Sequence, residues 1–467
     1  MEQIGTEANP LRVAIVGAGP TGFYAAEQLF KQRNLVVEVD MFEKLPTPFG
    51  LVRYGVAPDH QKIKSVTAVF DRTARKSNFR FYGNVELSRD VSVEDLRRLY
   101  HQIVYTTGAQ TDRSLGIPGE DLLGSHAATE FVAWYNGHPD FRDCRFDLSV
   151  RRAAVIGVGN VAVDVCRILS RTPEELARTD IADYALDALR ESNIREVYMI
   201  GRRGPAQAAF TTPEVKELGE LEDADVYVPP EEAQLDTLSE ETLSENADRA
   251  TTRKVEIIQS YVEKPSTPKG RKLILRFLVS PVELHGDDQG RVKAMKLVKN
   301  ELYKTDAGTL RPRATSEFET LPVDIVFRSI GYTGVPVPGV PFKKSWGVIE
   351  NEAGRVIDPE SGEPVRGEYT AGWIKRGATG VIGTNKPDAA ETVEAMIEDV
   401  NQGNVLEPTH PDVDDAREMI ASRQPHYFSY QDWQKLDEIE VTRGKEQGRP
   451  RVKFVNIDEM LEAIDRG

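Results

Sequence analysis

The chain has 467 residues, of which 40% are hydrophobic and 29% are charged, and its formal net charge is −16. This length suits two or three domains with sizeable cores. The negative charge argues against a general binder of nucleic acid or anionic membranes. No apolar run approaches membrane-spanning length, and residues 1–10 lack an apolar signal segment. We therefore expect a cytoplasmic protein with no nucleic-acid partner and no membrane insertion.

The cysteine content excludes several kinds of redox and metal site. Only Cys144 and Cys166 occur, and they lie far apart in the sequence. This excludes a CxxC redox pair, a cysteine-ligated iron–sulfur cluster and a disulfide framework. We expect no metal site.

The chain is organised around a glycine-rich turn near its N-terminus. Residues 13–16 are predicted as a buried parallel strand and residues 23–30 as a helix, with Gly17-Ala-Gly-Pro-Thr-Gly22 between them. The first glycine permits the tight turn, the second lets a pyrophosphate approach the backbone, and the third lets helix and strand pack closely. A second strand, residues 36–42, ends at Glu43, where an acid can accept hydrogen bonds from ribose hydroxyls. The pattern predicts a bound dinucleotide.

A second unit of the same kind follows later in the chain. Residues 153–156 are predicted as a strand, followed by the turn Gly157-Val-Gly-Asn-Val-Ala162 and a helix. The next strand, residues 196–200, is followed by Arg202 and Arg203 instead of an acid. Two guanidiniums there suit a 2′-phosphate and predict NADP as the ligand. The alternative is that both arginines are merely solvated surface residues.

Other stretches are less specific. Residues 44–60, rich in Pro and Gly, are predicted as an ordered loop near the first nucleotide. The strongly acidic residues 214–248 are predicted as solvated helix and loop. Residues 272–300 alternate apolar and polar side chains around a turn, which predicts a β-hairpin. The tail from about Asn401 is polar and contains several prolines, with an amphipathic end at residues 457–464.

Five motifs resemble those of the adrenodoxin-reductase-type ferredoxin–NADP reductases, which are flavoproteins with two dinucleotide-binding domains. They are Pro48-Phe-Gly-Leu-Val-Arg-Tyr-Gly-Val-Ala-Pro-Asp-His60, Trp134-Tyr-Asn-Gly137, Gly159-Asn-Val-Ala-Val-Asp164, Gly201-Arg-Arg-Gly-Pro205 and Gly372-Trp-Ile-Lys-Arg-Gly-Ala-Thr-Gly-Val-Ile382. The resemblance implies an α/β fold of two Rossmann-like domains, with the NADP domain inserted into the FAD domain. The implied bounds are 1–109 and 331–467 for the FAD domain, including the C-terminal tail, and 110–330 for the NADP domain.

The resemblance also implies two cofactors, FAD and NADP, and their contacts. Together with the first glycine turn, the predicted FAD contacts are Gly17, Gly19, Pro20, Thr21, Gly22, Glu43, Leu51, Leu87, Trp373, Gly380, Val381 and Ile382. The predicted NADP contacts are Val158, Gly159, Asn160, Val161, Arg202, Arg203, Glu214 and Gly380. Leu51 and Leu87 would otherwise be plain core residues. Trp373 replaces an acid common in related flavoproteins, so its ring is expected beside the flavin and nicotinamide.

The implied activity is that of a ferredoxin–NADP(+) reductase. NADPH would pass hydride to the flavin, and electrons would then leave singly for ferredoxin. The chain looks like a bacterial member without a fused ferredoxin domain, so we expect a separate ferredoxin-type iron–sulfur protein as partner. His60 and Glu217 could manage the accompanying proton as a His–carboxylate pair, and with Trp373 they are the candidate catalytic residues. His60 could equally be a structural hydrogen-bonding histidine.

Alternatives on the same fold stay open. A disulfide reductase would need a CxxC pair, and an amidotransferase-type subunit usually brings cysteine clusters; neither is present. A non-catalytic NADP-sensing flavoprotein would bind both cofactors without turnover. For the reductase, docking an acidic ferredoxin on a chain of charge −16 requires a local basic surface. The candidate cations are Arg53, Arg72, Arg75, Lys76, Lys375 and Arg376.

Overall fold

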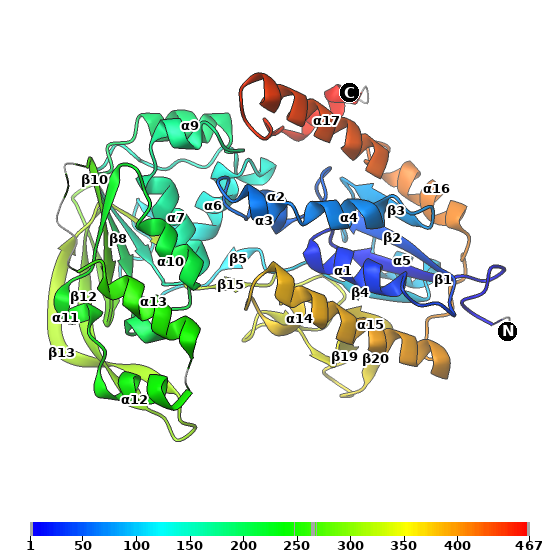
Figure 1. Ribbon diagram of the computed structural model, residues 1–467. Coiled ribbons are helices and arrows are strands. Elements are labelled where there is room, and N and C mark those ends of the chain that lie inside the picture. The colour runs from blue at the N-terminus through cyan, green and yellow to red at the C-terminus, as the bar shows by residue number, and fades with distance from the viewer. Residues whose placement is uncertain (1–2, 247, 263–266, 268, 465–467) are drawn as a thin grey trace. The chain divides into compact units, whose positions relative to one another are not determined.

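The computed structural model describes residues 3–246, 248–262, 267 and 269–464 (Figure 1). The chain divides into two compact units. Unit 1 comprises Met1–Val56, His60–Thr111 and Tyr332–Gly467, and unit 2 comprises Ala57–Asp59 and Asp112–Gly331. Most of unit 2 is therefore a single insertion into the sequence of unit 1.

Unit 1 is built on a seven-stranded sheet with the strand order β18-β19-β20-β4-β1-β2-β3. Five neighbouring strands, from β20 to β3, run parallel, and β18 and β19 are antiparallel. The central strand β1 is buried along its whole length, as its apolar sequence predicts for a sheet covered on both faces. The strands are β1 (Leu11–Val16), β2 (Val37–Glu43), β3 (Phe79–Gly83), β4 (Gln102–Tyr105), β18 (Asn351–Glu352), β19 (Arg355–Ile357) and β20 (Pro364–Thr370).

Helices of unit 1 come from both ends of the chain. Helices α1 and α15 pack together although they lie far apart in the sequence (Figure 1). The helices are α1 (Pro20–Leu29), α2 (Leu51–Tyr54), α3 (Gln61–Lys64), α4 (Thr67–Ala74), α5 (Val93–Leu99), α14 (Trp373–Arg376), α15 (Asn385–Gln402), α16 (Val413–Arg423), α17 (Tyr430–Glu446) and α18 (Ile457–Ala463), with a short 3-10 turn η3 (Ile382–Thr384). The polar tail thus contains two helices, α16 and α17, that its composition did not predict.

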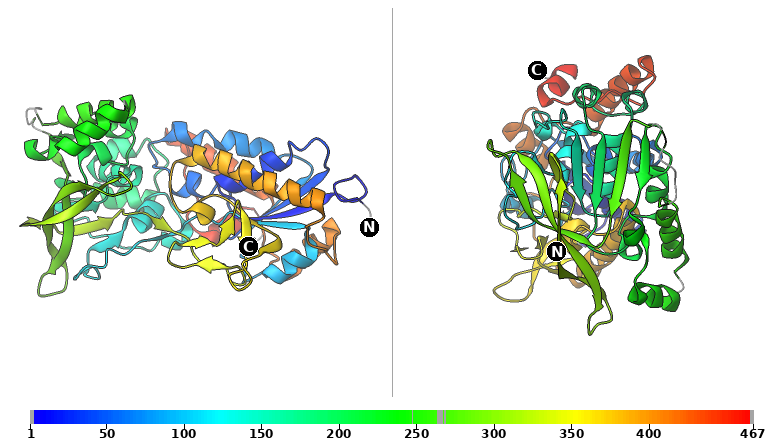
Figure 2. Two further views of the ribbon diagram at one scale, coloured as in Figure 1. Left: turned by 90° about the horizontal axis from the view of Figure 1, so that it is seen from below. Right: turned by 90° about the vertical axis from the view of Figure 1, so that its left-hand side faces the viewer.

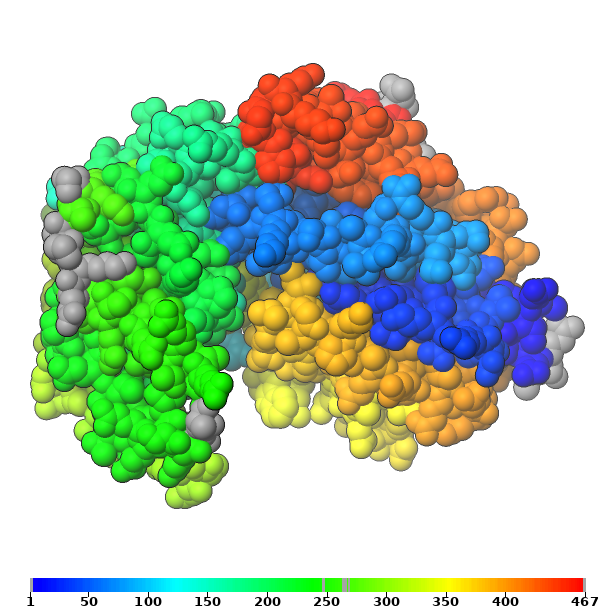
Figure 3. Space-filling model, in the orientation of Figure 1, coloured from blue at the N-terminus to red at the C-terminus, as the bar shows by residue number. Residues whose placement is uncertain are grey.

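The C-terminal segment lies against the N-terminal part of the same unit (Figure 3). The ring of Trp433 in α17 packs edge-on against Phe49, with 5.7 Å between ring centroids. Arg53 in α2 is buried and pairs with Glu440 of α17 through contacts of 2.8 and 2.5 Å. The tail therefore fixes the loop that leads from β2 into α2.

Unit 2 contains a six-stranded, all-parallel sheet with the order β6-β14-β7-β8-β10-β9 (Figure 2). A separate antiparallel sheet holds β11, β12 and β13. The strands are β6 (Ser125–Ala127), β7 (Arg152–Ile156), β8 (Glu196–Ile200), β9 (Ala224–Tyr227), β10 (Arg271–Arg276), β11 (Val279–Gly286), β12 (Val292–Lys304), β13 (Leu310–Pro322) and β14 (Ile325–Arg328). The helices include α6 (Ala128–Tyr135), α7 (Asn160–Ser170), α8 (Pro173–Leu176), α9 (Asp183–Arg190), α10 (Thr212–Leu218), α11 (Pro230–Ala233), α12 (Thr237–Asn246) and α13 (Arg249–Gln259).

One prediction for this region was wrong and another was confirmed in part. Residues 214–248 are not simply solvated: they contribute β9 to the sheet, and Glu214 and Glu232 in this stretch are buried. The predicted hairpin of residues 272–300 is formed by β11 and β12, whereas β10 belongs to the parallel sheet. In both cases long-range pairing decided a placement that local composition did not.

The α/β fold with two Rossmann-like sheets is confirmed, because each unit carries a parallel strand, a glycine turn and a helix in succession. Among the described helices, none has the length and apolar character needed to cross a membrane. The cytoplasmic location stays a prediction from the sequence.

Candidate functional site

The first glycine turn joins β1 to α1 in unit 1. Gly17 has a φ of 109°, and a Cβ there would lie 2.6 Å from the carbonyl oxygen of Thr106, so only glycine fits. At Gly19 no atom of the described residues lies within 4 Å of such a Cβ. In the described structure, α1 also has no side-chain cap, which leaves its first N–H groups and positive dipole end for an anion. The turn therefore fits a pyrophosphate.

Glu43, the last residue of β2, is held against this turn. One carboxylate oxygen accepts the N–H of Ala18 at 2.9 Å, and the other accepts the N–H of Leu45 at 3.2 Å. Burial raises the pKa of Glu43, although both N–H groups oppose the shift. The oxygens keep lone pairs for further donors, as binding ribose hydroxyls requires.

The loop before α2 folds back onto the glycine turn. The N–H of Phe49 donates to the carbonyl of Ala18 at 2.8 Å, and a Cβ at Gly50 would lie 3.0 Å from the backbone of the turn. Leu51 begins α2 beside it and is half-buried. Leu87, between β3 and α5, is also half-buried and packs against a core cluster of unit 1. The structure thus brings Leu51 next to the turn, whereas Leu87 packs against the core cluster.

Trp373 begins α14, directly after β20. Its indole N–H donates to the carbonyl of Thr379 at 3.1 Å, and its ring lies 5.7 Å from that of Tyr332. The preceding residue, Gly372, lies so close to Thr21 of α1 that a Cβ there would be 2.3 Å from the threonine hydroxyl. The half-buried Trp373 is therefore near the start of α1, on the glycine-turn side of unit 1.

The glycine loop after α14 completes this side of unit 1. Gly380 and Val381 are exposed, and Ile382 begins η3. The guanidinium of Arg376 donates to the carbonyl of Thr379 at 2.6 Å and to the side chain of Asn385 at 2.9 Å. These bonds hold both ends of the loop, so its exposed backbone has a defined conformation.

The second glycine turn, in unit 2, repeats the first. Gly157 has a φ of 137°, and a Cβ there would lie 2.1 Å from the carbonyl oxygen of Ser329. Gly159 again faces open space among the described residues. The carbonyl of Val158 accepts the N–H groups of Ala209 and Phe210 at 2.8 and 2.9 Å. This turn is therefore tied to the segment that follows β8.

The first residues of α7 lie beside the same segment. The side-chain oxygen of Asn160 accepts the N–H of Thr211 at 2.9 Å, and Val161 is half-buried in the first turn of the helix. As in α1, no side chain caps this helix in the described structure. Its N-terminal N–H groups fit an anion as well.

Arg202 and Arg203 follow β8. Arg202 is exposed and Arg203 is half-buried, and neither pairs with a carboxylate in the part of the chain that the structure describes. Burial, and then the neighbouring charge of Arg202, lower the pKa of Arg203. An anionic group would stabilise two adjacent guanidiniums of which one is partly desolvated and neither has a paired carboxylate among the described residues.

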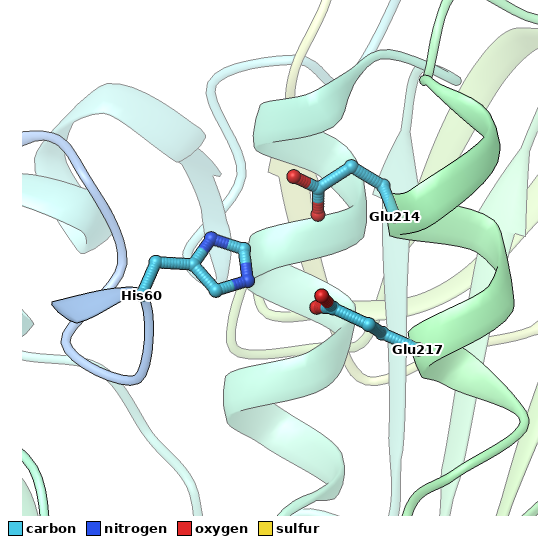
Figure 4. Close-up of side chains that lie close together, drawn as sticks. All are labelled: His60, Glu214 and Glu217. Carbon is cyan, nitrogen blue, oxygen red and sulfur yellow. The ribbon is translucent and has the colours of Figure 1, made fainter. Parts of the chain in front are cut away.

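Glu214 and Glu217 project from one side of α10 (Figure 4). Both lie near the fully buried guanidinium of Arg167 in α7, at 3.3 and 3.8 Å. The same guanidinium pairs with Asp59 and Asp164, each at 2.6 Å. Glu214 therefore belongs to a buried ion cluster, a role that the sequence prediction of an NADP contact did not include.

His60, also labelled in Figure 4, lies at the start of α3 in unit 1. It is half-buried, and its carbonyl accepts the N–H of Ile63 at 3.1 Å. Because His60 and Glu217 belong to different units, their predicted pairing stays a prediction.

Sequence reasoning missed Arg167. Its spacing from Asp164 on a predicted helix offered one signal, since residues three apart face each other. Its pairing with Asp59 joins segments that are 108 residues apart, and no local pattern reveals such a contact.

Two glycine turns on parallel strands, one with an acid and one with two arginines after the next strand, define a protein with two dinucleotide-binding domains. In agreement, the family described as pyridine nucleotide-disulphide oxidoreductase matches residues 11–202.

Full-length relatives define the family more narrowly. The chain is 47% identical over 454 residues to the NADPH-ferredoxin reductase FprA of Mycobacterium leprae, covering 96% of this chain and 97% of the relative. It is 40% identical to the mitochondrial NADPH:adrenodoxin oxidoreductase of Arabidopsis thaliana, covering 98% and 96%. The structure of Mycobacterium tuberculosis FprA in complex with NADPH superposes with a TM-score of 0.91 at 44% identity, covering 98% of this chain and all of that one. The chain belongs to the adrenodoxin-reductase-type ferredoxin–NADP reductases, as its motifs predicted.

Proposed function

We propose that this chain transfers electrons between NADPH and a ferredoxin-type iron–sulfur protein through bound FAD. The observation that carries the proposal is the presence of two glycine turns of the same geometry with opposite charge beside them. When bound, FAD supplies the redox chemistry, because a flavin can take up two electrons as hydride and release them singly.

Unit 1 is proposed as the FAD domain. The backbone at Gly19 and the start of α1 would hold the pyrophosphate, and Glu43 would accept hydrogen bonds from the ribose. The remaining contacts predicted from the sequence are retained in the proposal: Gly17, Pro20, Thr21, Gly22, Leu51, Leu87, Gly380, Val381 and Ile382. Trp373 would exclude water from one side of the isoalloxazine and orient the nicotinamide.

Unit 2 is proposed as the NADP domain. The backbone of Val158 to Val161 would receive the pyrophosphate, and Arg202 and Arg203 the 2′-phosphate. Glu214 and Gly380 remain proposed contacts. His60 and Glu217 are proposed to hold and move the proton that accompanies hydride transfer, because a His–carboxylate pair can take up and release a proton near neutral pH.

A separate ferredoxin is proposed as the electron partner. Two of the candidate cations are excluded from a ferredoxin-docking surface, because Arg53 is buried against Glu440 and Lys375 is buried beside Asp388. Arg376 is engaged in the glycine loop. The exposed candidates that remain are Arg72, Arg75 and Lys76, at and after the end of α4.

The alternative of a disulfide reductase gains nothing from the structure. Cys166 is buried in α7, and burial raises the pKa of its thiol. Burial, together with Glu130 and Asp143, also raises the pKa of the Cys144 thiol. Neither thiol has the depressed pKa of a reactive cysteine.

The proposal is tested by three measurements on the purified protein. The protein should release one FAD on denaturation, and NADPH should reduce the bound flavin, which ferredoxin should then reoxidise in stopped-flow mixing. Turnover with ferricyanide separates an enzyme from a non-catalytic NADP sensor, which would bind both cofactors and show no turnover. A folded protein that cannot be loaded with FAD would overturn the proposal.

The dependence of turnover on salt concentration tests whether ferredoxin docks electrostatically. Exposed charges are screened over about 8–10 Å at physiological ionic strength, so ferredoxin-dependent turnover should fall as salt rises, whereas turnover with a neutral quinone should change little. Charge reversal at Arg72 and Lys76 should remove this dependence. A ferredoxin rate that is indifferent to salt would contradict electrostatic docking.

A further inference from the structure

The arginine pair after β8 lies on a segment whose backbone is fixed from two sides. On one side, the side-chain amide of Asn300 in β12 donates to the carbonyl of Arg202 at 3.0 Å, and the N–H of Leu278 donates to that of Arg203 at 3.2 Å. On the other side, the ammonium of Lys254 donates to the carbonyl of Ala208 at 2.5 Å. Residues 202–208 are therefore held by two side chains and one backbone N–H from distant parts of the sequence.

Lys254 is an unusual residue to find at this position. It lies on α13, which packs against the turn of residues 205–207, and only 8% of the residue is exposed. Its ammonium lies 6.0 Å from the ring centroid of Phe210. A lysine is rarely buried this completely without a carboxylate, because its charge loses hydration.

In the described part of the chain, no carboxylate forms an ion pair with the ammonium of Lys254. Asp248 is the carboxylate that acts on it, but Asp248 is at the N-terminus of α13, where its side chain caps Ala250 and binds Thr251. Burial first, and then the positive charge of Arg203, lower the pKa of Lys254, whereas Asp248 raises it. The positive charge of Arg203 therefore acts on the ammonium of Lys254.

Lys254 is thus bonded to the same segment after β8 that carries the cations Arg202 and Arg203. Like charges repel, most strongly where burial reduces screening by solvent. An anion with multiple negative charges, bound at this place, would offset the repulsion of all three.

We propose that Lys254 is a third determinant of NADP specificity, which adds positive charge to the 2′-phosphate site and positions the segment that carries Arg202 and Arg203. The inference rests on the proposed assignment of the arginine pair to the 2′-phosphate. A buried ammonium is suited to this task because its charge is poorly screened by solvent. Its bond to Ala208 couples the same side chain to the conformation of the arginine segment.

The test compares three substitutions of Lys254. Lys254→Met removes both charge and donor, Lys254→Gln keeps a hydrogen-bond donor without charge, and Lys254→Arg keeps the charge. Binding of adenosine 2′,5′-bisphosphate and of ADP, which lacks the 2′-phosphate, is measured by calorimetry on the FAD-loaded protein. KM and kcat for NADPH and NADH are measured with ferricyanide.

We expect Lys254→Met and Lys254→Gln to weaken adenosine 2′,5′-bisphosphate about tenfold and to raise the KM for NADPH similarly, because both remove the buried positive charge that would act on the phosphate. ADP binding, the KM for NADH and both kcat values should stay within about twofold. Lys254→Arg should restore most of the affinity. If Lys254→Met does not fold, the Gln and Arg variants decide the question between them.

Lys269→Met is the matched control. Lys269 also donates to a backbone carbonyl of unit 2, that of Leu221 at 2.6 Å, but it lies at the other end of the strands, before β10. Its loss should leave nucleotide preference unchanged.

Two outcomes would overturn the inference. Equal losses for adenosine 2′,5′-bisphosphate and ADP would mean that Lys254 only supports the fold, and unchanged binding in the Gln variant would mean that its charge is irrelevant. Arg202→Ala, measured alongside, separates these outcomes from failure of the proposed function. If Arg202→Ala does not weaken adenosine 2′,5′-bisphosphate, the phosphate site itself is misassigned.

Discussion

The two glycine turns of this protein share one backbone design and differ in the charge beside it. In both, the first glycine has a positive φ and packs against a carbonyl of a neighbouring strand end, and the second faces open space. In unit 1 a carboxylate, Glu43, follows the second strand, and in unit 2 the arginines Arg202 and Arg203 do. Ribose hydroxyls can donate hydrogen bonds, whereas a phosphate at neutral pH mainly accepts them, so the sign of this charge distinguishes the two ligands.

The comparison extends to how each charged group is held. Glu43 is held directly, because its two oxygens accept backbone N–H groups. The arginine side chains make no such bonds to carboxylates in the described residues; instead their carbonyls are held by Asn300 and Leu278. The carboxylate of Glu43 can accept backbone N–H groups and still accept hydrogen bonds from ribose hydroxyls. The guanidiniums of Arg202 and Arg203 must instead keep their N–H donors free for a phosphate.

The largest effect should come from Arg202→Ala combined with Arg203→Ala. Each charge-assisted bond contributes about 1.5–3 kcal/mol, so the KM for NADPH should rise by about a hundredfold or more. Use of NADH should barely change. Steady-state ferricyanide reduction with both nucleotides measures this, with bound FAD as the control. Equal loss with NADPH and NADH would remove the distinction between the two sites.

The next largest effect should come from Glu440→Ala in unit 1. The substitution leaves Arg53 and Arg451 near each other without their shared carboxylate, and breaking a buried pair costs about 3–5 kcal/mol. Denaturant unfolding followed by release of flavin fluorescence measures the loss. Glu407→Ala, which removes an exposed pair with Arg366, is the control and should cost less than about 1 kcal/mol. Similar losses in both variants would mean that the tail does not hold the α2 loop.

Acid should lower the free energy of unfolding of both units by the same mechanism. Burial first, and then Arg12 or Arg328, lower the pKa of His101 in unit 1 and of His126 in unit 2 to about 4. An unfolded histidine has a pKa of about 6.5, so between these values the unfolded chain binds more protons. Stability is then complete above about pH 6.5 and falls as the pH decreases towards 4, by up to about 3 kcal/mol for each histidine.

Unfolding measured across this window checks the pH effect. His101→Gln keeps an acceptor for the N–H of Arg12 but cannot titrate, so it should reduce the pH dependence of unit 1. An unaltered pH profile in this variant would assign the acid sensitivity to other groups.

The smallest effect should come from Glu43→Gln. An amide offers one acceptor oxygen where the carboxylate offers two, so FAD affinity should fall about tenfold, measured by titrating the apoprotein with FAD. Binding of adenosine 2′,5′-bisphosphate to unit 2 should not change. Unchanged FAD affinity would mean that the backbone cradle alone holds the flavin nucleotide.

Much of the fold was predictable from local pattern. The apolar strand before each glycine turn, the turn itself and the charge after the next strand all lie within short windows, where side-chain size and backbone freedom leave few conformations. The helix start at Ser92 was predictable for the same reason, and the structure shows a reciprocal capping box between Ser92 and Asp95. The motifs that indicate the family also lie within short stretches of sequence.

The sequence by itself thus determined the two glycine cradles, the sign of the charge beside each and the family of the chain. Only the tertiary structure decided which charges are buried and which partners they have. Arg53 and Glu440 lie 387 residues apart, and Lys254 reaches the carbonyl of Ala208 from a separate helix. The local sequence around a buried arginine or lysine does not distinguish it from a solvated one. Its pairing depends on where the chain returns in space, and that is set by the packing of whole sheets and helices.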